Sequence, residues 1–124
     1  MFSNVVIISN DLNIVAHTRT TALTLTKLNK QIHFKEISLD NLTVPSNDIP
    51  SNTNYIIVDL DEKFDIMIDY IKEIRNDKNL CSIKIIALIS SDSQQKREGI
   101  FSAGCDSIMT KSEFITVADK IFLY

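Results

Sequence analysis

The sequence is poor in glycine, with Gly99 and Gly104 the only two in 124 residues. A glycine-rich loop that wraps a phosphate group is therefore nearly excluded, because such a loop needs several glycines in a short stretch. The two cysteines, Cys81 and Cys105, match no spacing of a metal or redox site, so two reduced thiols are expected. No apolar run approaches the roughly 20 residues of a membrane-spanning helix, and no membrane partner is expected.

The sequence also lacks a strong excess of charge of either sign. It has 13 Lys and Arg against 16 Asp and Glu, a formal net charge of −3. This mild acidity argues against a nucleic-acid partner held on a broad basic face. The N-terminus shows neither the basic region nor the small-residue cleavage site of a secretory signal, so a cytoplasmic location is expected. The length suits one domain over residues 1–124 with a real core.

What the sequence does contain is a regular alternation of short apolar runs and amphipathic stretches. Runs rich in Val and Ile are typical of strands buried on both faces, and they occupy residues 5–8, 55–58 and 83–89. Residues 107–110 form a shorter strand, and residues 32–37 alternate as an edge strand would. Because helical patterns separate these strands, the sequence predicts an α/β fold with a five-stranded parallel sheet and helices on both faces.

The helical patterns carry their own start signals. Asn10 or Asp11 can cap the first helix, whose apolar face comprises Ile14, Val15, Thr18, Ala22 and Leu25. Ser112 can cap the last helix, whose inner face comprises Phe114, Val117, Ala118 and Ile121. Two further signals lie at residues 91–93, which offer caps for another helix, and at Gly104, which can end it.

The second helix is predicted to be degraded. Residues 40–54 occupy the place of a crossover helix, but Pro45 and Pro50 stand among Ser, Asn and Thr there. Proline breaks a helix interior, so this segment is expected to be mostly loop with one turn near Leu42.

Polar residues gather at the carboxyl ends of the predicted strands. Asp59 and Asp61 follow the third strand, Ser90 the fourth and Lys111 the fifth, while residues 9–11 (Ser, Asn, Asp) follow the first. Ligands of doubly wound sheets bind outside these ends, so the groups are expected to converge on one rim.

Three segments in this order resemble the receiver domain of two-component response regulators. They are VDLD at residues 58–61, IIAL at 85–88 and AGCDSIMTK at 103–111. The similarity covers essentially the whole chain, and the spacing matches without gaps from the third strand to Lys111. The resemblance implies a flavodoxin-like sheet of strand order 2-1-3-4-5.

The resemblance also implies a role for each matching position. Asp59 would accept a phosphoryl group from a histidine kinase in a phosphorelay, and Lys111 would pair with that group. Two acidic residues after the first strand would hold Mg²⁺. A Thr or Ser ending the fourth strand and an aromatic residue on the fifth would relay the change to a partner. Attack of a carboxylate on an anionic phosphorus needs these cations to offset negative charge.

The sequence departs from that pattern at several positions. The acidic pair is replaced by Ser9 and Asn10, with Asp11 next along the chain. Ile89 stands at the switch position with Ser90 beside it, and Ile108 stands at the aromatic position. In addition, Ser112 replaces the usual proline after the lysine. If Mg²⁺ binds at all, the oxygen ligands left for it are those of Asp59, Asp61, Asp11 and Asn10.

We therefore expect an atypical receiver that keeps the acceptor Asp and the Lys but acts by protein–protein interaction. Its partner would be a histidine kinase or a downstream target, and the chain would be a monomer or weak homodimer. The residues expected to form the partner surface are Ile108, Ser112, Phe114 and Ile115.

Two alternatives stay open. The chain could be an active receiver phosphorylated on Asp59, with at most a weak phosphatase activity on its own aspartyl phosphate. It could instead be a flavodoxin-like nucleotide or flavin binder that uses residues 9–13 as a polar phosphate loop. Asp59 also has a purely structural interpretation, because an aspartate at the end of a strand often caps the following turn.

Overall fold

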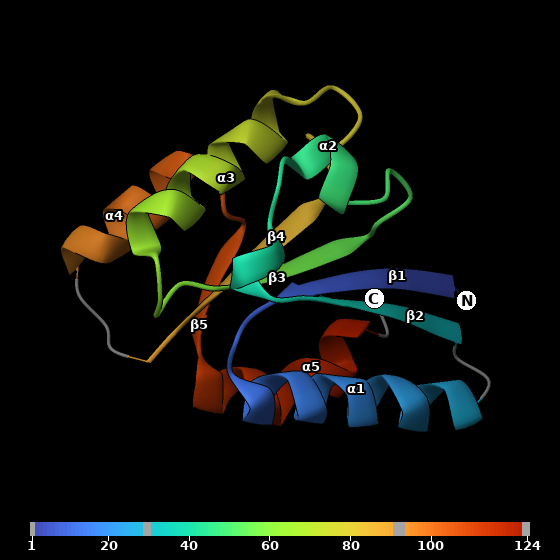
Figure 1. Ribbon diagram of the computed structural model, residues 1–124. Coiled ribbons are helices and arrows are strands. Elements are labelled where there is room, and N and C mark those ends of the chain that lie inside the picture. The colour runs from blue at the N-terminus through green and yellow to red at the C-terminus, as the bar shows by residue number, and fades with distance from the viewer. Residues whose placement is uncertain (1, 29–30, 91–93, 123–124) are drawn as a thin grey trace.

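The computed structural model describes residues 2–28, 31–90 and 94–122 (Figure 1). Its strands are β1 (Phe2–Ile8), β2 (Gln31–Ile37), β3 (Tyr55–Asp59), β4 (Lys84–Ile89) and β5 (Ser107–Thr110). Its helices are α1 (Leu12–Lys27), α2 (Pro45–Asp48), α3 (Phe64–Asn76), α4 (Gln94–Ala103) and α5 (Lys111–Phe122), with a short 3₁₀ helix at Leu39–Asn41.

The strands form one parallel sheet in the order β2-β1-β3-β4-β5, which confirms the predicted class and strand order. Helices α1 and α5 cover one face, and α2, α3 and α4 cover the other (Figure 1). Strand β3 lies in the middle and all five of its residues are buried. Because parallel strands all end at the same side, the carboxyl ends of β1, β3, β4 and β5 share one rim.

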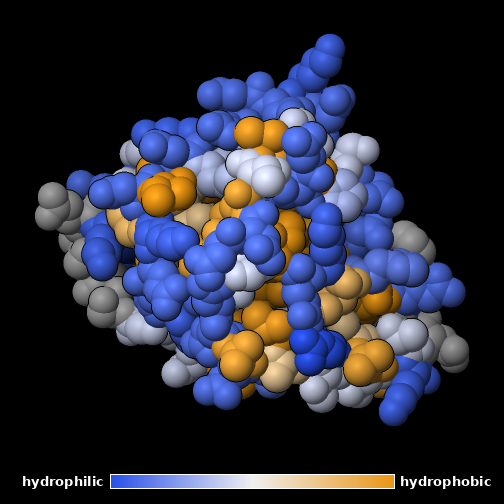
Figure 2. Space-filling model, in the orientation of Figure 1, coloured by the Kyte–Doolittle hydropathy of each residue, from blue (hydrophilic) through white to orange (hydrophobic). Residues whose placement is uncertain are grey.

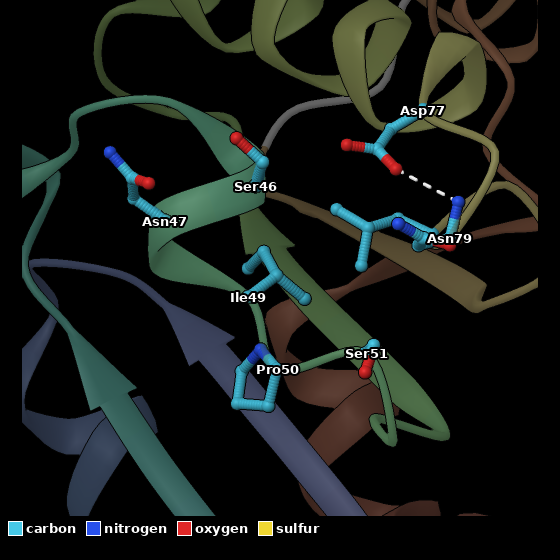
Figure 3. Close-up of a pocket in the computed structure, with 8 residues that line it drawn as sticks. Ser46, Asn47, Ile49, Pro50, Ser51, Asp77 and Asn79 are labelled. Atoms are coloured by element: carbon cyan, nitrogen blue, oxygen red, sulfur yellow. Dashed lines mark hydrogen bonds between the residues drawn. The ribbon is translucent and has the colours of Figure 1, made fainter.

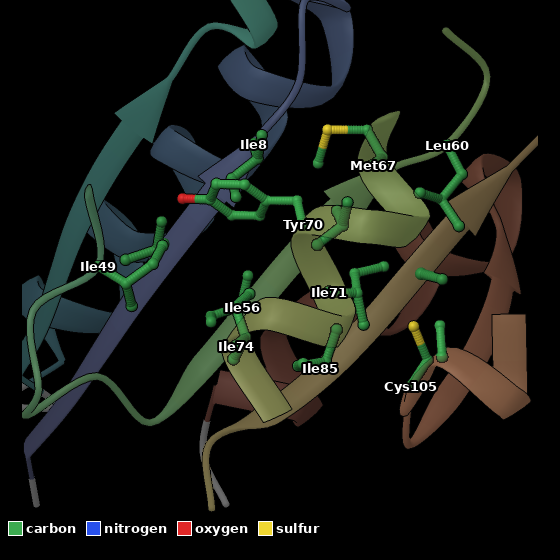
Figure 4. Packing of buried hydrophobic residues seen from close by; sticks show 14 of the residues in the cluster. Ile8, Ile49, Ile56, Leu60, Met67, Tyr70, Ile71, Ile74, Ile85 and Cys105 are labelled. Atoms are coloured by element: carbon green, nitrogen blue, oxygen red, sulfur yellow. The ribbon is translucent and has the colours of Figure 1, made fainter. Parts of the chain in front are cut away.

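The core is divided by the sheet into two apolar layers. Strand residues alternate between them: Ile56 and Val58 face α3, while Tyr55 and Ile57 face α1 and α5. Figure 4 shows α3 placing its apolar stripe on the strands, with Met67 and Ile71 pointing toward the sheet. This two-sided burial fixes the ends of β3, including Asp59, in the framework.

Helix α1 has the cap and the face that the sequence predicts. Asp11 is its N-cap, and Asp11 Oδ1 accepts from Asn13 N at 3.0 Å and from Ile14 N at 3.4 Å. The buried residues of α1 are Ile14, Val15, Thr18, Ala22 and Leu25, which are the predicted apolar face.

The segment before β3 is degraded as predicted, but Pro45 has a different role. It does not interrupt a helix; it is the first residue of α2, where its missing N–H is no loss. A cavity of about 360 Å³ lies between α2 and the α3–β4 connection, lined by residues that include Ile49, Pro50, Asp77 and Asn79 (Figure 3). These residues precede β3 or follow α3, so the cavity lies at the opposite end of the sheet from Asp59.

The predicted cap of α5 is wrong. Helix α5 begins at Lys111, and Thr110 caps it: Thr110 Oγ1 accepts from Glu113 N at 3.1 Å, and Glu113 Oε1 accepts from Thr110 N at 3.4 Å. This reciprocal pair is a capping box, so Ser112 falls inside the first turn. Gly104 does follow the end of α4, with φ of 119°, as predicted. The capping residues predicted at 91–93 lie outside the described residues.

Candidate functional site

The rim at the carboxyl ends of the strands brings together the polar residues that the sequence placed there. Asp59 is the last residue of β3 and Lys111 the first of α5, directly after β5. Ser9 and Asp11 follow β1, and Ser90 follows β4. The expected convergence of residues that are distant in the sequence is confirmed by the contacts below.

Asp59 is almost fully enclosed, with 3% of its surface exposed. Asp59 Oδ2 accepts from the hydroxyl of Ser9 at 2.7 Å and lies 3.2 Å from Lys111 Nζ. Asp59 Oδ1 accepts from Asp61 N at 3.0 Å. This is the bond expected if Asp59 caps the turn after its strand. Both oxygens of the buried carboxylate therefore have partners, as a buried charge requires.

Lys111 does not pair with Asp59 alone. Its Nζ lies 2.8 Å from Asp61 Oδ2 and 3.0 Å from Asp11 Oδ2, in addition to the 3.2 Å contact with Asp59. An ammonium has three protons, so the three carboxylates use its whole donor capacity. Three negative charges thus face one positive charge at this rim.

The pKa values of the rim groups follow from this arrangement. Burial alone would raise the pKa values of Asp11 and Asp61, but hydrogen bonds and charge from Lys111, together with other donors, leave both below their usual range. Burial alone would lower the pKa of Lys111, but the contacts with Asp61, Asp11 and Asp59 outweigh burial and raise it. Asp11, Asp61 and Lys111 therefore carry their charge at neutral pH.

Asp61 connects the rim to the segment after β4. Asp61 Oδ1 accepts from Ser90 N at 2.8 Å, and Asp61 Oδ2 accepts a short hydrogen bond from the Ser90 hydroxyl. Ile89, at the predicted switch position, is 2% exposed and belongs to the core. Ser90 is therefore the residue at this strand end that contacts the charged cluster, through Asp61 rather than through Asp59.

Of the four residues predicted as oxygen ligands, three converge and one does not. Asn10 turns away: its Oδ1 accepts from the Ser38 hydroxyl at 2.7 Å and from Leu39 N at 2.9 Å. Its Nδ2 donates to Glu62 Oε2 at 3.3 Å. Asn10 therefore anchors the end of β2 and does not point at Asp59, which corrects its place in the predicted set.

The remaining carboxylates are candidate ligands of a divalent ion. Their hard oxygens suit Mg²⁺, which needs near-ideal octahedral geometry. However, the ammonium of Lys111 lies where the oxygens of Asp11, Asp59 and Asp61 meet. Within residues 2–28, 31–90 and 94–122, no group of three acidic, His or Cys side chains has the arrangement of a metal site. The residues do not fit Mg²⁺ while Lys111 holds all three contacts.

The residues predicted to form the partner surface differ in their exposure. Ser112 and Ile115 are exposed, and Ile108 is half-buried against the core. Phe114 is fully buried, 0% exposed, and packs edge-on with Phe122 at 6.5 Å between ring centroids. Its assignment to the surface is wrong, because residues 114, 118 and 122 recur at helical spacing and face the sheet.

Two sets of contacts at the rim were not predicted from the sequence. Ser9 was expected at the rim, but not its hydrogen bonds: its hydroxyl donates to Asp59 and accepts from Asp11 N at 3.0 Å. The capping box of Thr110 and Glu113, which positions Lys111, is readable as T-x-x-E in the sequence.

Solved structures similar to this chain match it along almost its whole length. A response regulator from Hahella chejuensis is 17% identical, with a TM-score of 0.72 over 98% of this chain and 93% of the other. The Mn²⁺-bound form of response regulator Rcp1 is 13% identical, with a TM-score of 0.74 over 96% and 91%. The non-phosphorylated receiver domain of the stress response regulator RcsB from Escherichia coli is 16% identical, with a TM-score of 0.70 over 97% and 89%.

This chain has the receiver-domain fold. The three structures named above are response regulators or the receiver domain of one, so their fold is the one that the sequence resemblance indicated. No protein-family model matches the sequence, and no curated protein matches it either. In the described part of the chain, no helix is both long and apolar enough to cross a membrane.

Proposed function

We propose that this chain is an atypical receiver module, one domain over residues 1–124, that acts by binding a partner protein. In this proposal Lys111 stays bound to Asp59, the residue at the acceptor position. The protein then signals without Mg²⁺-dependent phosphorylation of Asp59. The observation that carries the proposal is the contact of Lys111 Nζ with three carboxylates within 3.2 Å.

The charge balance of the rim supports this assignment. A phosphoryl donor is anionic, and Asp11 and Asp61 add two negative charges next to the acceptor. Transfer to a carboxylate needs cations that offset this charge, whereas the single ammonium is already shared by three carboxylates. Asp59 is also buried, and each of its oxygens has a hydrogen-bond partner.

The partner surface in this proposal is formed by β5 and the outer face of α5. Ser112 and Ile115 are exposed there, and Ile115 is 42% exposed despite being apolar. Ile108 contributes its accessible part from β5. The proposed partner is a protein, either a histidine kinase or a downstream target.

An active receiver is the second candidate, because the central pair is kept. Lys111 Nζ lies 3.2 Å from Asp59 Oδ2, within reach of an oxygen on a phosphorylated Asp59. In that case the donor would transfer its phosphoryl group to Asp59 Oδ and release its leaving group, and water would later hydrolyse the aspartyl phosphate. Catalysis would be limited to this slow self-hydrolysis.

Incubation with acetyl phosphate and Mg²⁺, followed by intact-mass measurement, separates the two candidates. The atypical receiver predicts no added phosphate, and it predicts no change in the amide NMR spectrum on addition of beryllofluoride. A mass gain of one phosphate that Asp59→Asn abolishes would instead establish the active receiver. An absorbance spectrum of the purified protein tests the flavin alternative, for which no flavin band is expected.

A further inference from the structure

The carboxylate of Asp61 is bound by three donor groups that come from two other strand ends. Lys111, after β5, places Nζ 2.8 Å from Asp61 Oδ2, and the hydroxyl of Ser90, after β4, donates to the same oxygen. Ser90 N donates to Asp61 Oδ1 at 2.8 Å. An ammonium, a hydroxyl and a backbone N–H together are the donors that hold a small oxyanion. Here the oxyanion is a side chain of the chain itself.

The other two carboxylates of the rim have structural tasks in their own segments. Asp11 Oδ1 accepts from two N–H groups in the first turn of α1. Asp59 Oδ1 accepts from Asp61 N in the turn after β3. Both oxygens of Asp61 are instead bound by donors from other segments. Asp61 therefore links the end of β4 to the start of α5.

Burial does not force Asp61 into these contacts. Its side chain is 27% exposed, against 4% for Asp59. Figure 2 shows mostly hydrophilic surface on the side toward which the strands run, where water can hydrate a carboxylate. Hydrogen bonds and charge from Lys111 and Ser90 nonetheless outweigh the partial burial and keep the pKa of Asp61 below its usual range. The donors thus favour the ionised carboxylate at this place.

Asp61 also uses the donors that a phosphoryl group on Asp59 would need. Such a group brings acceptor oxygens that call for charged or hydroxyl donors beside Asp59. Lys111 Nζ lies 3.2 Å from Asp59 Oδ2 and is already bound to Asp61. Because Asp61 is tethered to the rim, its effective concentration there is high, and it stays in place despite the negative charges of Asp11 and Asp59.

We propose that Asp61 serves as a built-in substitute for a phosphoryl group on Asp59. Its carboxylate joins Ser90 to Lys111 and keeps the ends of β4 and β5 in one fixed arrangement. The partner surface of β5 and α5 is then ready to bind without any phosphoryl donor. This inference rests on the proposed function, because it supplies the anion that an unphosphorylated receiver lacks.

Chemical rescue tests the proposal on the whole chain, followed by ¹⁵N NMR. Asp61→Ala removes the carboxylate and leaves its donors in place, so we expect the amide signals of Ser90, Thr110 and Ile115 to shift. Acetate carries the same functional group and should return these signals toward their wild-type positions at about 10 to 100 mM. Chloride at the same ionic strength should not restore them. In the wild type, acetate should leave the signals unchanged.

Matched variants show whether the vacated carboxylate position is the cause. Asp61→Asn fills the position with a neutral side chain, so its signals should shift but acetate should not restore them. Asp69→Ala removes an exposed carboxylate of α3 and should leave the signal of Ser90 in place.

Three results would each overturn the proposal. They are signals of Thr110 and Ile115 that do not move in Asp61→Ala, no recovery in the stated range of acetate, and an equal response of the wild type to acetate. None of the solutions contains a phosphoryl donor, so these results are separate from the mass measurement that tests the proposed function. A chain that fails this test and gains no phosphate would still be an atypical receiver, in which the contacts of Asp61 are structural only.

Discussion

Two cations tie distant parts of the chain together, and their surroundings differ. Arg75 donates to three backbone carbonyls, those of Gly104 and Ile83 at 2.7 Å and of Cys81 at 2.8 Å, and to Asp106 Oδ2 at 2.7 Å. Lys111 instead contacts three carboxylates, with Nζ to oxygen distances of 2.8 to 3.2 Å. One cation has a single counter-charge, and the other has three.

The difference separates a contact that stabilises the fold from one that we propose to be functional. Around Arg75 the charges balance, and four of the five N–H donors of its guanidinium are bound by groups that the fold supplies. Around Lys111 negative charge is in excess, which stabilises the fold less than a balanced pair would. Clusters of this kind are characteristic of functional sites, where stability is given up for chemistry or for binding.

The largest expected effect comes from removing Arg75. Arg75→Met leaves the carbonyls of Gly104 and Ile83 without their donor and Asp106 without its counter-charge. We expect the free energy of unfolding to fall by about 3 kcal/mol. Urea denaturation measures it, and a loss below that of Lys111→Met would contradict the structural role.

Removing Lys111 should give a smaller loss that depends on pH. In Lys111→Met three carboxylates are left together, and we expect a loss of about 2 kcal/mol at neutral pH. In the wild type the lowered pKa values of Asp11 and Asp61 give stability that is present above their usual value of 3.8 and is lost as pH falls through the lowered values. In the variant the carboxylates repel one another, so their protonation relieves the repulsion.

The deficit of Lys111→Met should therefore shrink as the pH falls from neutral to about 4. Urea denaturation of both proteins across this range checks the sign. The raised pKa of Lys111 acts in the other direction: its stabilisation is full below its usual value of 10.5 and is lost only as pH rises through the raised value. A deficit that grows on acidification would rule out carboxylate repulsion at this rim.

The smallest expected loss of stability comes from changing Gly104, whose lack of a side chain leaves room for the side chain of Arg75. Gly104 has φ of 119°, and a Cβ there would lie 2.5 Å from Arg75 Cγ, which cannot retreat because the guanidinium is fixed. We expect Gly104→Ala to lower the free energy of unfolding by about 1 to 2 kcal/mol. Thermal unfolding measures this loss as a lower midpoint temperature.

Gly99→Ala is the matched control for this change. Gly99 lies inside α4 with nothing within 4 Å of an added Cβ, so alanine should raise stability by up to about 1 kcal/mol. Equal destabilisation by both substitutions would show that the close approach to Arg75 is not the cause.

Much of the fold could be predicted because single elements carry strong local signals. The apolar runs of the central strands and the face of α1 follow from periodicity alone, and Asp11 was recognisable as a cap. Phe114 was predicted both for the inner face of the last helix and for the partner surface, and it is fully buried. Positions that face the sheet and positions that face solvent alternate within one helical turn, so a side chain that packs on the sheet is not available to a partner.

The site was only half predictable. Strand order brings Asp59 and Lys111 to one rim, so their meeting could be expected. Asp11 and Asp61 both contact the ammonium of Lys111, and these contacts depend on side-chain rotamers. The orientation of Asn10 toward Ser38 depends on its rotamer in the same way. Such contacts are decided by competition among neighbours within a few ångströms, which no spacing along the chain encodes.

A magnesium titration tests the central claim most directly. Followed by ¹⁵N NMR at the amides of Asp59, Asp61 and Ser90, it compares the wild type with Lys111→Met. If the ammonium holds the three carboxylates against a metal, millimolar Mg²⁺ leaves the wild-type signals in place. Removing the ammonium should then raise the affinity by about tenfold or more. Binding of Mg²⁺ by the wild type as tightly as by the variant would contradict the account.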